Sequence, residues 1–162
     1  MVNTTIVNIN SALKYHIAMA AMLGDNDFIS RALTQSPFNL IQNAQKTYPA
    51  SIKQLPDKFD ARLSSFLIAP ANYIGDLNNP NPADIMPGQW YYDIHDNTLN
   101  YRIRNSEHFF GGMEGIPMLK FKVVLDYNDN NGNGQFDQGI DTYNSIGLNS
   151  IGNIIWTGQG IE

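Results

Sequence analysis

The sequence contains no cysteine, no long apolar run and few basic residues. Without cysteine the chain has no disulfide, no thiolate zinc site and no cysteine nucleophile. It holds no stretch of about 18 consecutive apolar residues, so nothing in the sequence as it stands has the length to span a bilayer. Its 10 lysines and arginines are scattered among 15 acidic residues, for a net charge of −5. An acidic chain without a basic cluster argues against nucleic acid and anionic lipid as partners.

Catalytic signatures are missing as well. The sequence has no G-x-S-x-G, no P-loop, no H-E-x-x-H and no glycine-rich dinucleotide motif. Its three histidines, His16, His95 and His108, are far apart along the chain. Asp93 and Asp96 fit a turn better than an acid–base pair. These absences favour a protein that is not an enzyme, and an enzyme that uses His95 and Asp93 is the less favoured alternative.

The composition is that of a globular chain. A length of 162 residues with 43% hydrophobic and 15% charged residues suits one domain with its own core. We expect a single domain over residues 1–162. It is divided into a helix over 1–24, an irregular region of helices and loops over 25–88, and an antiparallel sheet over 89–162.

The first segment has the periodicity of an amphipathic helix. Its apolar residues recur every three or four positions, and Gly24 followed by Asp25 is a stop signal. The helix begins almost at residue 1 without a capping residue, so we expect it to continue a longer helix. The apolar stripe consists of Ile6, Ile9, Leu13, Ile17, Ala20 and Leu23.

Two short helices are expected next, one over 28–35 capped by Asp27 and one from Pro37 to about Lys46 capped by Ser36. Six prolines then punctuate residues 48–87 and exclude long regular elements there. The apolar run 66–68 fits either a helix end or a short strand. Tyr73, Ile74 and Leu77 are expected to anchor an ordered surface loop.

Antiparallel strands are expected in the last part of the chain. The candidates are Gln89–Ile94, Leu99–Arg104, Leu119–Asp126 and Ile151–Thr157, with a turn at 95–98 between the first two. The predicted fold class is therefore α+β, an N-terminal amphipathic helix packed on an antiparallel β-sheet of about four strands.

The second expected strand alternates in polarity. Its apolar residues Leu99, Tyr101 and Ile103 share one face. Its polar residues Asn100, Arg102 and Arg104 share the other. This pattern predicts that one face is packed and the other faces water.

One loop carries a chemically specific pattern. Residues 129–137 fit the first nine positions of a calcium loop, with oxygen-bearing side chains at alternate positions and Gly134 at the sharp bend. Calcium is a hard cation that takes six to eight oxygen ligands, which such a loop supplies. The candidate ligands for Ca²⁺ are Asp129, Asn131, Asn133, Gln135 through its carbonyl, Asp137 and Asp141.

The calcium pattern is incomplete at its end. Position twelve is Ile140 instead of a bidentate glutamate, so Asp141 is expected to supply the missing carboxylate, with Asp126 in reserve. A frame that starts at Asp126 lacks the glycine. Because two opening ligands are neutral asparagines, we expect a dissociation constant of about 0.1–1 mM. The alternative is a loop whose Asn, Asp and Gly residues simply form turns.

Trp90, Tyr91 and Tyr92 make one strand aromatic. Alternation places Trp90 and Tyr92 on one face and Tyr91 on the other. We favour the interpretation that these aromatic side chains lie in the core and in an interface. Stacking on sugar, as in an adhesin, is the alternative.

Several segments resemble the type IV pilin-like family. They are the leading helix, the stretch Ala71–Asp76, the segment Pro87–Asp93 and the segment Leu99–Asn105. The chain is most similar to pilus subunits of the MSHA type and to type II secretion pseudopilins of Gram-negative bacteria. Their apolar start of the form Gly-Phe-Thr-Leu-Ile-Glu is not in this sequence, so we expect a head that lacks its hydrophobic helix.

The resemblance implies a function. It implies a structural subunit of a surface pilus that polymerises with other pilin subunits and sits in the inner membrane, facing the periplasm, before assembly. It also implies a long helix in the filament core and a sheet packed on its other half. Many members close a C-terminal loop with a disulfide, whereas major pseudopilins hold that region with calcium. A pseudopilin and a secreted calcium-ordered adhesin module are the alternatives.

Overall fold

The computed structural model describes residues 2–47, 67–104 and 116–152. The fold is α+β, as predicted, with an N-terminal helix and a sheet of five strands in the order β1-β2-β3-β4-β5. All neighbouring strands are antiparallel except β1 and β2, which are parallel. The sheet thus has one strand more than expected. Within the described residues no helix is long and apolar enough to cross a membrane.

Helix α1 runs over Val2–Leu23 and confirms the predicted amphipathic helix. The stripe residues Ile9, Leu13, Ile17 and Ala20 are buried, because they recur on one side of a helix with 3.6 residues per turn. Gly24 ends the helix with a φ of 71°, a left-handed conformation that glycine adopts without a Cβ clash.

Helices α2, Phe28–Thr34, and α3, Pro37–Thr47, also form where expected. Asp27 occupies the N-cap position of α2, but its side chain makes no capping bond. The carboxylate at this end of the helix that does form hydrogen bonds is that of Asp25. Its Oδ1 accepts the Asp27 N–H at 3.3 Å and its Oδ2 pairs with Arg31 at 2.6 Å. A carboxylate at this end of α2 also complements the helix dipole.

The strands are β1 Tyr73–Leu77, β2 Trp90–Asp93, β3 Thr98–Arg102, β4 Met118–Asn128 and β5 Thr142–Ile151. The predicted hairpin of β2 and β3 is confirmed, with Trp90 opposite Tyr101 and Tyr92 opposite Leu99. Strand β4 forms as predicted, but it begins one residue earlier and ends two residues later than expected.

One expectation about the sheet is wrong. Residues 73–77 were expected in a loop but form edge strand β1, which pairs in parallel with β2 across the η2 turn, Pro82–Asp84. The last strand that the structure describes, β5, was not expected; it ends at Ile151, where the expected strand Ile151–Thr157 begins, and its partner residues in β4 fix its register. Residues 153–157 lie outside the described part of the chain. Leu67 is buried but, like Ile68, belongs to neither a helix nor a strand.

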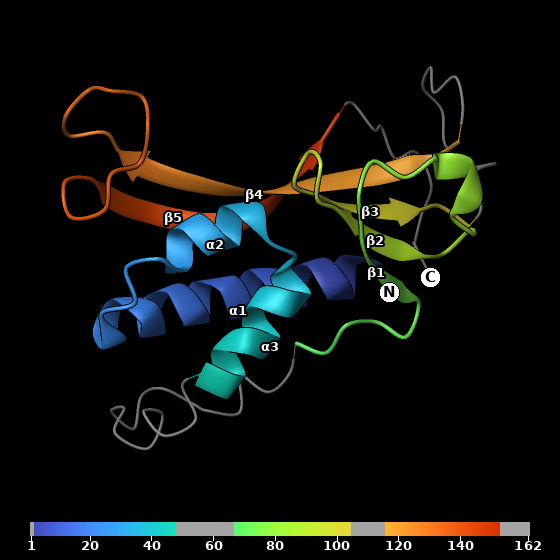
Figure 1. Cartoon of the computed structure of the whole chain (residues 1–162), viewed down its shortest axis with the longest axis horizontal. Helices are drawn as coiled ribbons and strands as arrows, with labels where there is room; N and C mark the ends of the chain where they lie inside the picture. Colours follow the sequence, from blue (N-terminus) through green and yellow to red (C-terminus); the bar gives the residue numbers. More distant parts are fainter. Residues whose placement is uncertain (1, 48–66, 105–115, 153–162) are drawn as a thin grey trace.

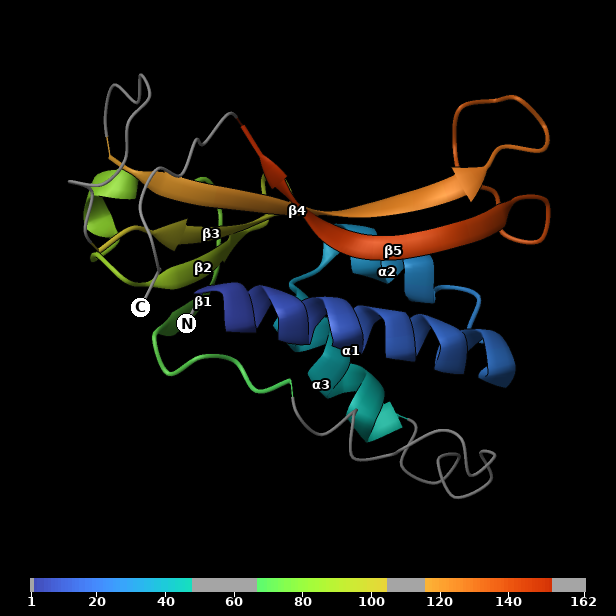
Figure 2. The ribbon, with the colours of Figure 1, turned by 180° about the vertical axis from the view of Figure 1, so that it is seen from behind.

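The helices form a layer on one face of the sheet (Figures 1 and 2). Helix α1 packs against β5, α2 packs against β4, and α3 packs against α1 on the side away from the sheet. Asn10 ties the layers together, since its Oδ1 accepts the N–H of Leu148 in β5 at 2.7 Å. The main core lies between these layers and includes Ile9, Leu13, Phe28, Phe38, Ile41, Trp90, Leu99 and Ile146.

The other face of β2 and β3 is covered too. Ile85, Tyr91 and Met118 form a second cluster there. Asn100, expected to face water, has 0% of its surface exposed, and its Nδ2 donates to the Thr98 carbonyl at 3.0 Å. The expectation of a face in water is therefore wrong at Asn100, because the segment that contains Ile85 folds back over it, whereas Arg102 is partly exposed and Arg104 is exposed.

Candidate metal centre

The candidate calcium loop lies at the tip of the long β4–β5 hairpin, which extends past the helices (Figure 1). Phe136 holds the loop to the core, since its ring meets that of Tyr127 edge-on at 5.4 Å. Gln138 and Asp141 form a bridge where the loop returns to β5. The frame that starts at Asp126 fits poorly, because Asp126 is within β4.

Asp129 organises the first turn of the loop. Its Oδ1 accepts the N–H of Gly132 at 2.6 Å and its Oδ2 accepts the N–H of Gly134 at 2.7 Å. These backbone N–H groups, that of Gly134 first, hold the pKa of Asp129 below its usual range. Gly134 has a φ of 77°, as the predicted sharp bend requires.

Asn131, Asn133 and Asp137 converge on one point. The Nδ2 atoms of both asparagines donate to the Oδ2 of Asp137, each at 2.6 Å. Their Oδ1 atoms accept backbone N–H groups two residues on, from Asn133 at 3.1 Å and from Gln135 at 2.8 Å. The loop is thus closed by hydrogen bonds between the same side chains that were predicted to bind an ion.

Asp141 closes the base of the loop. Its Oδ1 accepts the N–H of Asn130 at 2.8 Å and its Oδ2 accepts the N–H of Asp137 at 2.7 Å. The Nδ2 of Asn130 donates to the Ile140 carbonyl at 2.7 Å. Asp141 therefore joins the two ends of the loop, which explains why a carboxylate stands directly after Ile140.

The donor chemistry fits a hard cation. Four predicted ligand side chains, those of Asp129, Asn131, Asn133 and Asp137, belong to one hydrogen-bonded turn, and all carry oxygen. Across the described residues no three His, Asp or Glu side chains group closely enough to hold a metal. Binding an ion at this loop therefore depends on the asparagine oxygens and on turning both amides toward it.

Other titratable groups have structural partners. The Oδ1 of Asp93, which is 6% exposed, accepts the N–H groups of Asn79 at 2.9 Å and His95 at 3.0 Å, as expected for a turn former. His16 is buried in α1, and its Nδ1 is 2.9 Å from the Ala12 carbonyl. His108 lies outside the described residues. These contacts do not assemble an acid–base pair from Asp93 and His95.

The aromatic strand β2 is fully buried. Trp90 and Tyr92 belong to the main core and Tyr91 to the second cluster, with 2% of each side chain exposed. Burial raises the pKa of Tyr91 to about 12. The predicted division of faces is confirmed, and stacking of a sugar on these rings is excluded by their burial.

A polar network that the sequence analysis missed joins α3 to β1. The Tyr73 hydroxyl donates to Asp76 Oδ1 at 2.7 Å and is 2.9 Å from the Ser36 hydroxyl. Asn39 donates to Asp76 Oδ2 at 2.8 Å. Burial raises the pKa of Tyr73. No local pattern links residues this far apart, so only the folded structure identifies the network.

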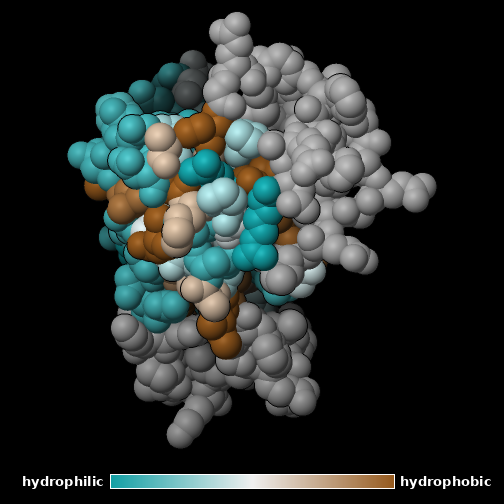
Figure 3. All heavy atoms as spheres, turned by 90° about the vertical axis from the view of Figure 1, so that its right-hand side faces the viewer, coloured by the Kyte–Doolittle hydropathy of each residue, from teal (hydrophilic) through white to brown (hydrophobic). Residues whose placement is uncertain are grey.

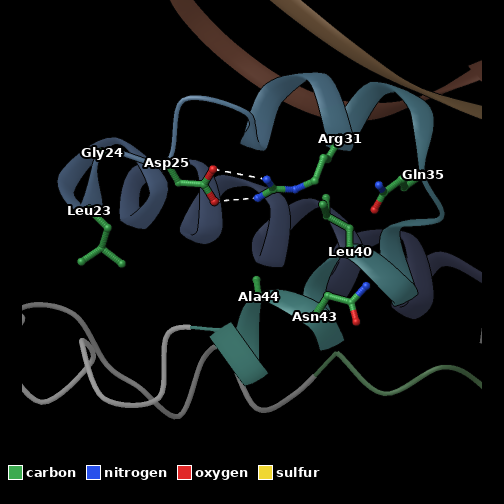
Figure 4. Close-up of a pocket in the computed structure, with 8 residues that line it drawn as sticks. All are labelled: Leu23, Gly24, Asp25, Arg31, Gln35, Leu40, Asn43 and Ala44. Atoms are coloured by element: carbon green, nitrogen blue, oxygen red, sulfur yellow. Dashed lines mark hydrogen bonds and ion pairs between the residues drawn. The ribbon is translucent and has the colours of Figure 1, made fainter.

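A pocket of about 450 Å³ lies between the end of α1, α2 and α3 (Figure 4). The charged groups that line it, Asp25 and Arg31, pair with each other by two bonds of 2.6 and 3.3 Å. This pocket therefore presents no free charge from that pair. Seen from the end that carries η2, the described surface mixes small hydrophobic and hydrophilic groups (Figure 3).

The chain was compared with protein-family models, curated proteins and solved structures, and none of them matches it.

Proposed function

We propose that this chain is the head of a type IV pilin-like filament subunit, a structural protein whose loop over residues 129–141 is ordered by Ca²⁺. The observation that carries the proposal is the packing of α1. A helix of 22 residues, about 33 Å long, lies against β5 and is followed by a helical middle region and an antiparallel hairpin. This order and packing agree with the architecture that the resemblance implies.

The exposed strip of α1 supports a role in assembly. The sheet covers one side of the helix and α3 covers another, and among the described residues a strip on the first half of α1 is exposed for contact with other subunits. Val7 gives this strip an apolar centre, with 61% of its surface exposed. The strip consists of Asn3, Thr4, Val7, Asn8, Ser11 and Lys14.

The calcium part of the proposal is supported by the loop. Its oxygen-bearing side chains gather in one turn around Asp137, and Gly134 has the positive φ that the bend requires. An ion that binds only the folded state stabilises that state. In this proposal the ion orders a hairpin tip that projects beyond the helical layer, where neighbouring heads meet, and takes the place of the disulfide that a chain without cysteine lacks.

The proposed partners are other pilin subunits, and the proposed site before assembly is the periplasmic side of the inner membrane of a Gram-negative bacterium. A type II secretion pseudopilin is the second candidate, and the loop favours it, because calcium holds the corresponding region of major pseudopilins. The adhesin alternative was suggested by the aromatic strand, and the rings of that strand are buried and do not offer a surface for a sugar.

Val7→Glu tests the filament proposal in cells that produce the full chain. Val7 is exposed, so the substitution leaves the fold stable to within about 0.5 kcal/mol. It places a charge where subunits pack, and burying an unpaired charge is costly. We expect filaments that bind antibody against this chain to fall at least about tenfold in electron micrographs.

Val124→Glu is the matched control. Val124 is also exposed, at 42%, but it lies on β4. We expect this variant to assemble as the wild type does. Antibody that labels no filament on wild-type cells, or Val7→Glu filaments as numerous as those of the control, would contradict the proposal.

A further inference from the structure

We propose that Asn131 and Asn133 are sites of spontaneous deamidation, and that cation binding in the loop protects them. Each is followed by glycine, and these are the only two Asn-Gly pairs in the sequence. Deamidation starts when the backbone nitrogen of the next residue attacks the side-chain carbonyl carbon of asparagine. Glycine has no Cβ to hinder that approach. Both pairs lie in the exposed part of the loop.

The hydrogen bonds around Asn131 hold each reacting group. The attacking nitrogen, that of Gly132, donates to Asp129 Oδ1 at 2.6 Å. The oxygen that gains negative charge, Asn131 Oδ1, accepts the Asn133 N–H at 3.1 Å, which stabilises it. The departing Nδ2 donates to Asp137 Oδ2 at 2.6 Å. Each of the three reacting groups, the nucleophile, the oxyanion and the leaving group, therefore has a hydrogen-bond partner.

The same arrangement recurs at Asn133. The nitrogen of Gly134 donates to Asp129 Oδ2 at 2.7 Å, and Asn133 Oδ1 accepts the Gln135 N–H at 2.8 Å. Its Nδ2 also donates to Asp137 Oδ2 at 2.6 Å. Asp129 thus serves both attacking nitrogens and Asp137 serves both leaving groups.

The reaction is balanced by water alone. The bond between the glycine nitrogen and the asparagine Cγ forms, the Cγ–Nδ2 bond breaks, and the amide proton of glycine leaves with Nδ2 as ammonia. Water then opens the cyclic imide at either carbonyl and gives aspartate or isoaspartate. The net change is asparagine plus water to an acid plus ammonia, without an oxidant or reductant.

Protection by a cation rests on the proposed function. An ion bound by the asparagine oxygens turns both amides away from Asp137 and from the backbone N–H groups that now hold them. It also fixes the loop and prevents the approach of the glycine nitrogen. The chain then keeps its asparagines while calcium is bound and loses them in its absence.

The test is peptide mapping after incubation of the folded chain with a chelator at about 37 °C. Chymotryptic cleavage after Tyr127 and Phe136 isolates residues 128–136, and fragmentation locates the change from amide to acid. We expect Asn131 and Asn133 to change before Asn144 and Asn149, which are held in β5. Change at the β5 asparagines first, or no change at the loop over several weeks, would overturn the proposal.

Asp137→Asn tests the positioning of the two amides. This variant removes the carboxylate that holds both leaving groups, so we expect both reactions to slow roughly tenfold. Asp84→Asn, which removes a carboxylate in the η2 turn, is the matched control and is expected to leave the rates unchanged. Equal rates in the two variants would contradict the assigned geometry.

Calcium in the incubation separates this inference from the proposed function. We expect calcium to slow both reactions at least about tenfold, which is the protection that binding predicts. If both asparagines deamidate at equal rates in chelator and in calcium, the assignment of the modification sites is retained. The calcium part of the proposed function is then refuted.

Discussion

His16 is a buried titratable side chain in the helical layer, with 1% of its surface exposed. It lies parallel to the Phe28 ring, with the ring centroids 6.5 Å apart. Burial lowers its pKa, because a charged imidazolium would lose its hydration, and the bond to the Ala12 carbonyl offsets this only in part. His16 therefore packs as a neutral aromatic residue between α1 and α2.

This burial makes the fold sensitive to acid. Because the pKa of His16 is lower in the folded than in the unfolded state, the unfolded state binds the proton first as pH falls below about 6.5. We expect the free energy of unfolding to fall between about pH 7.5 and about pH 5, measured by urea denaturation. His16→Leu is expected to reduce this loss, whereas His95→Gln, at an exposed turn, is expected to retain it. Equal pH dependence in the two variants would contradict the assignment.

Residue-scale prediction from sequence succeeded where the cause is local. Gly134 takes the expected positive φ, and Trp90 and Tyr92 share the core face because strand alternation is fixed by backbone geometry. It failed at Asn100 because burial of that side chain depends on a segment that contains Ile85, which folds over it from elsewhere in the chain. The sequence also pointed to the carboxylates and amides of the loop, but not to the way they close it.

At the scale of elements, one side-chain hydrogen bond joins α1 to β5 in addition to their hydrophobic packing. Asn10 Oδ1 accepts the Leu148 N–H, and a Cβ on Gly147 would lie 3.3 Å from the same oxygen. Among the strands that the structure describes, β5 is an edge strand, and no other described strand pairs with its outward N–H groups. Asn10 therefore satisfies one of these groups and fixes how the helix meets the sheet.

Asn10→Ala tests this junction. Removing the acceptor leaves the partly buried Leu148 N–H unpaired, which costs about 1 kcal/mol of stability. We expect this loss in urea denaturation. Asn10→Asp has nearly the same size and keeps an acceptor oxygen, so it is expected to retain most of the stability. If both variants lose the same amount, the bond does not join the two elements.

Element prediction from sequence also has a clear physical limit. Helices α1, α2 and α3 were found because their apolar spacing, glycine and proline signals are local. Strand β5 was missed, since its sequence is rich in Asn and Ser and its pairing with β4 holds it extended. Strand β1 was missed because parallel pairing with β2 joins segments that no turn motif connects.

At the scale of the whole molecule, the fold separates two surfaces. The exposed strip belongs to α1 in the helical layer. The candidate calcium loop lies at the tip of the β4–β5 hairpin (Figure 2). In the proposed filament the first surface holds subunits together and the second shapes the contact between heads. The α+β class could be predicted from the order of patterns, whereas the fifth strand and the cover over β3 could not.

Thermal unfolding with calcium and with chelator tests the central claim most directly. At about 10 mM calcium, ten to a hundred times the expected dissociation constant, binding to the folded state alone adds about 1.4–2.7 kcal/mol. This corresponds to a rise in Tm of about 3–10 °C for a chain of this length. Asp129→Asn is expected to abolish the rise and Asp84→Asn, in the η2 turn, to keep it. An equal Tm for the wild type in calcium and in chelator would contradict the account.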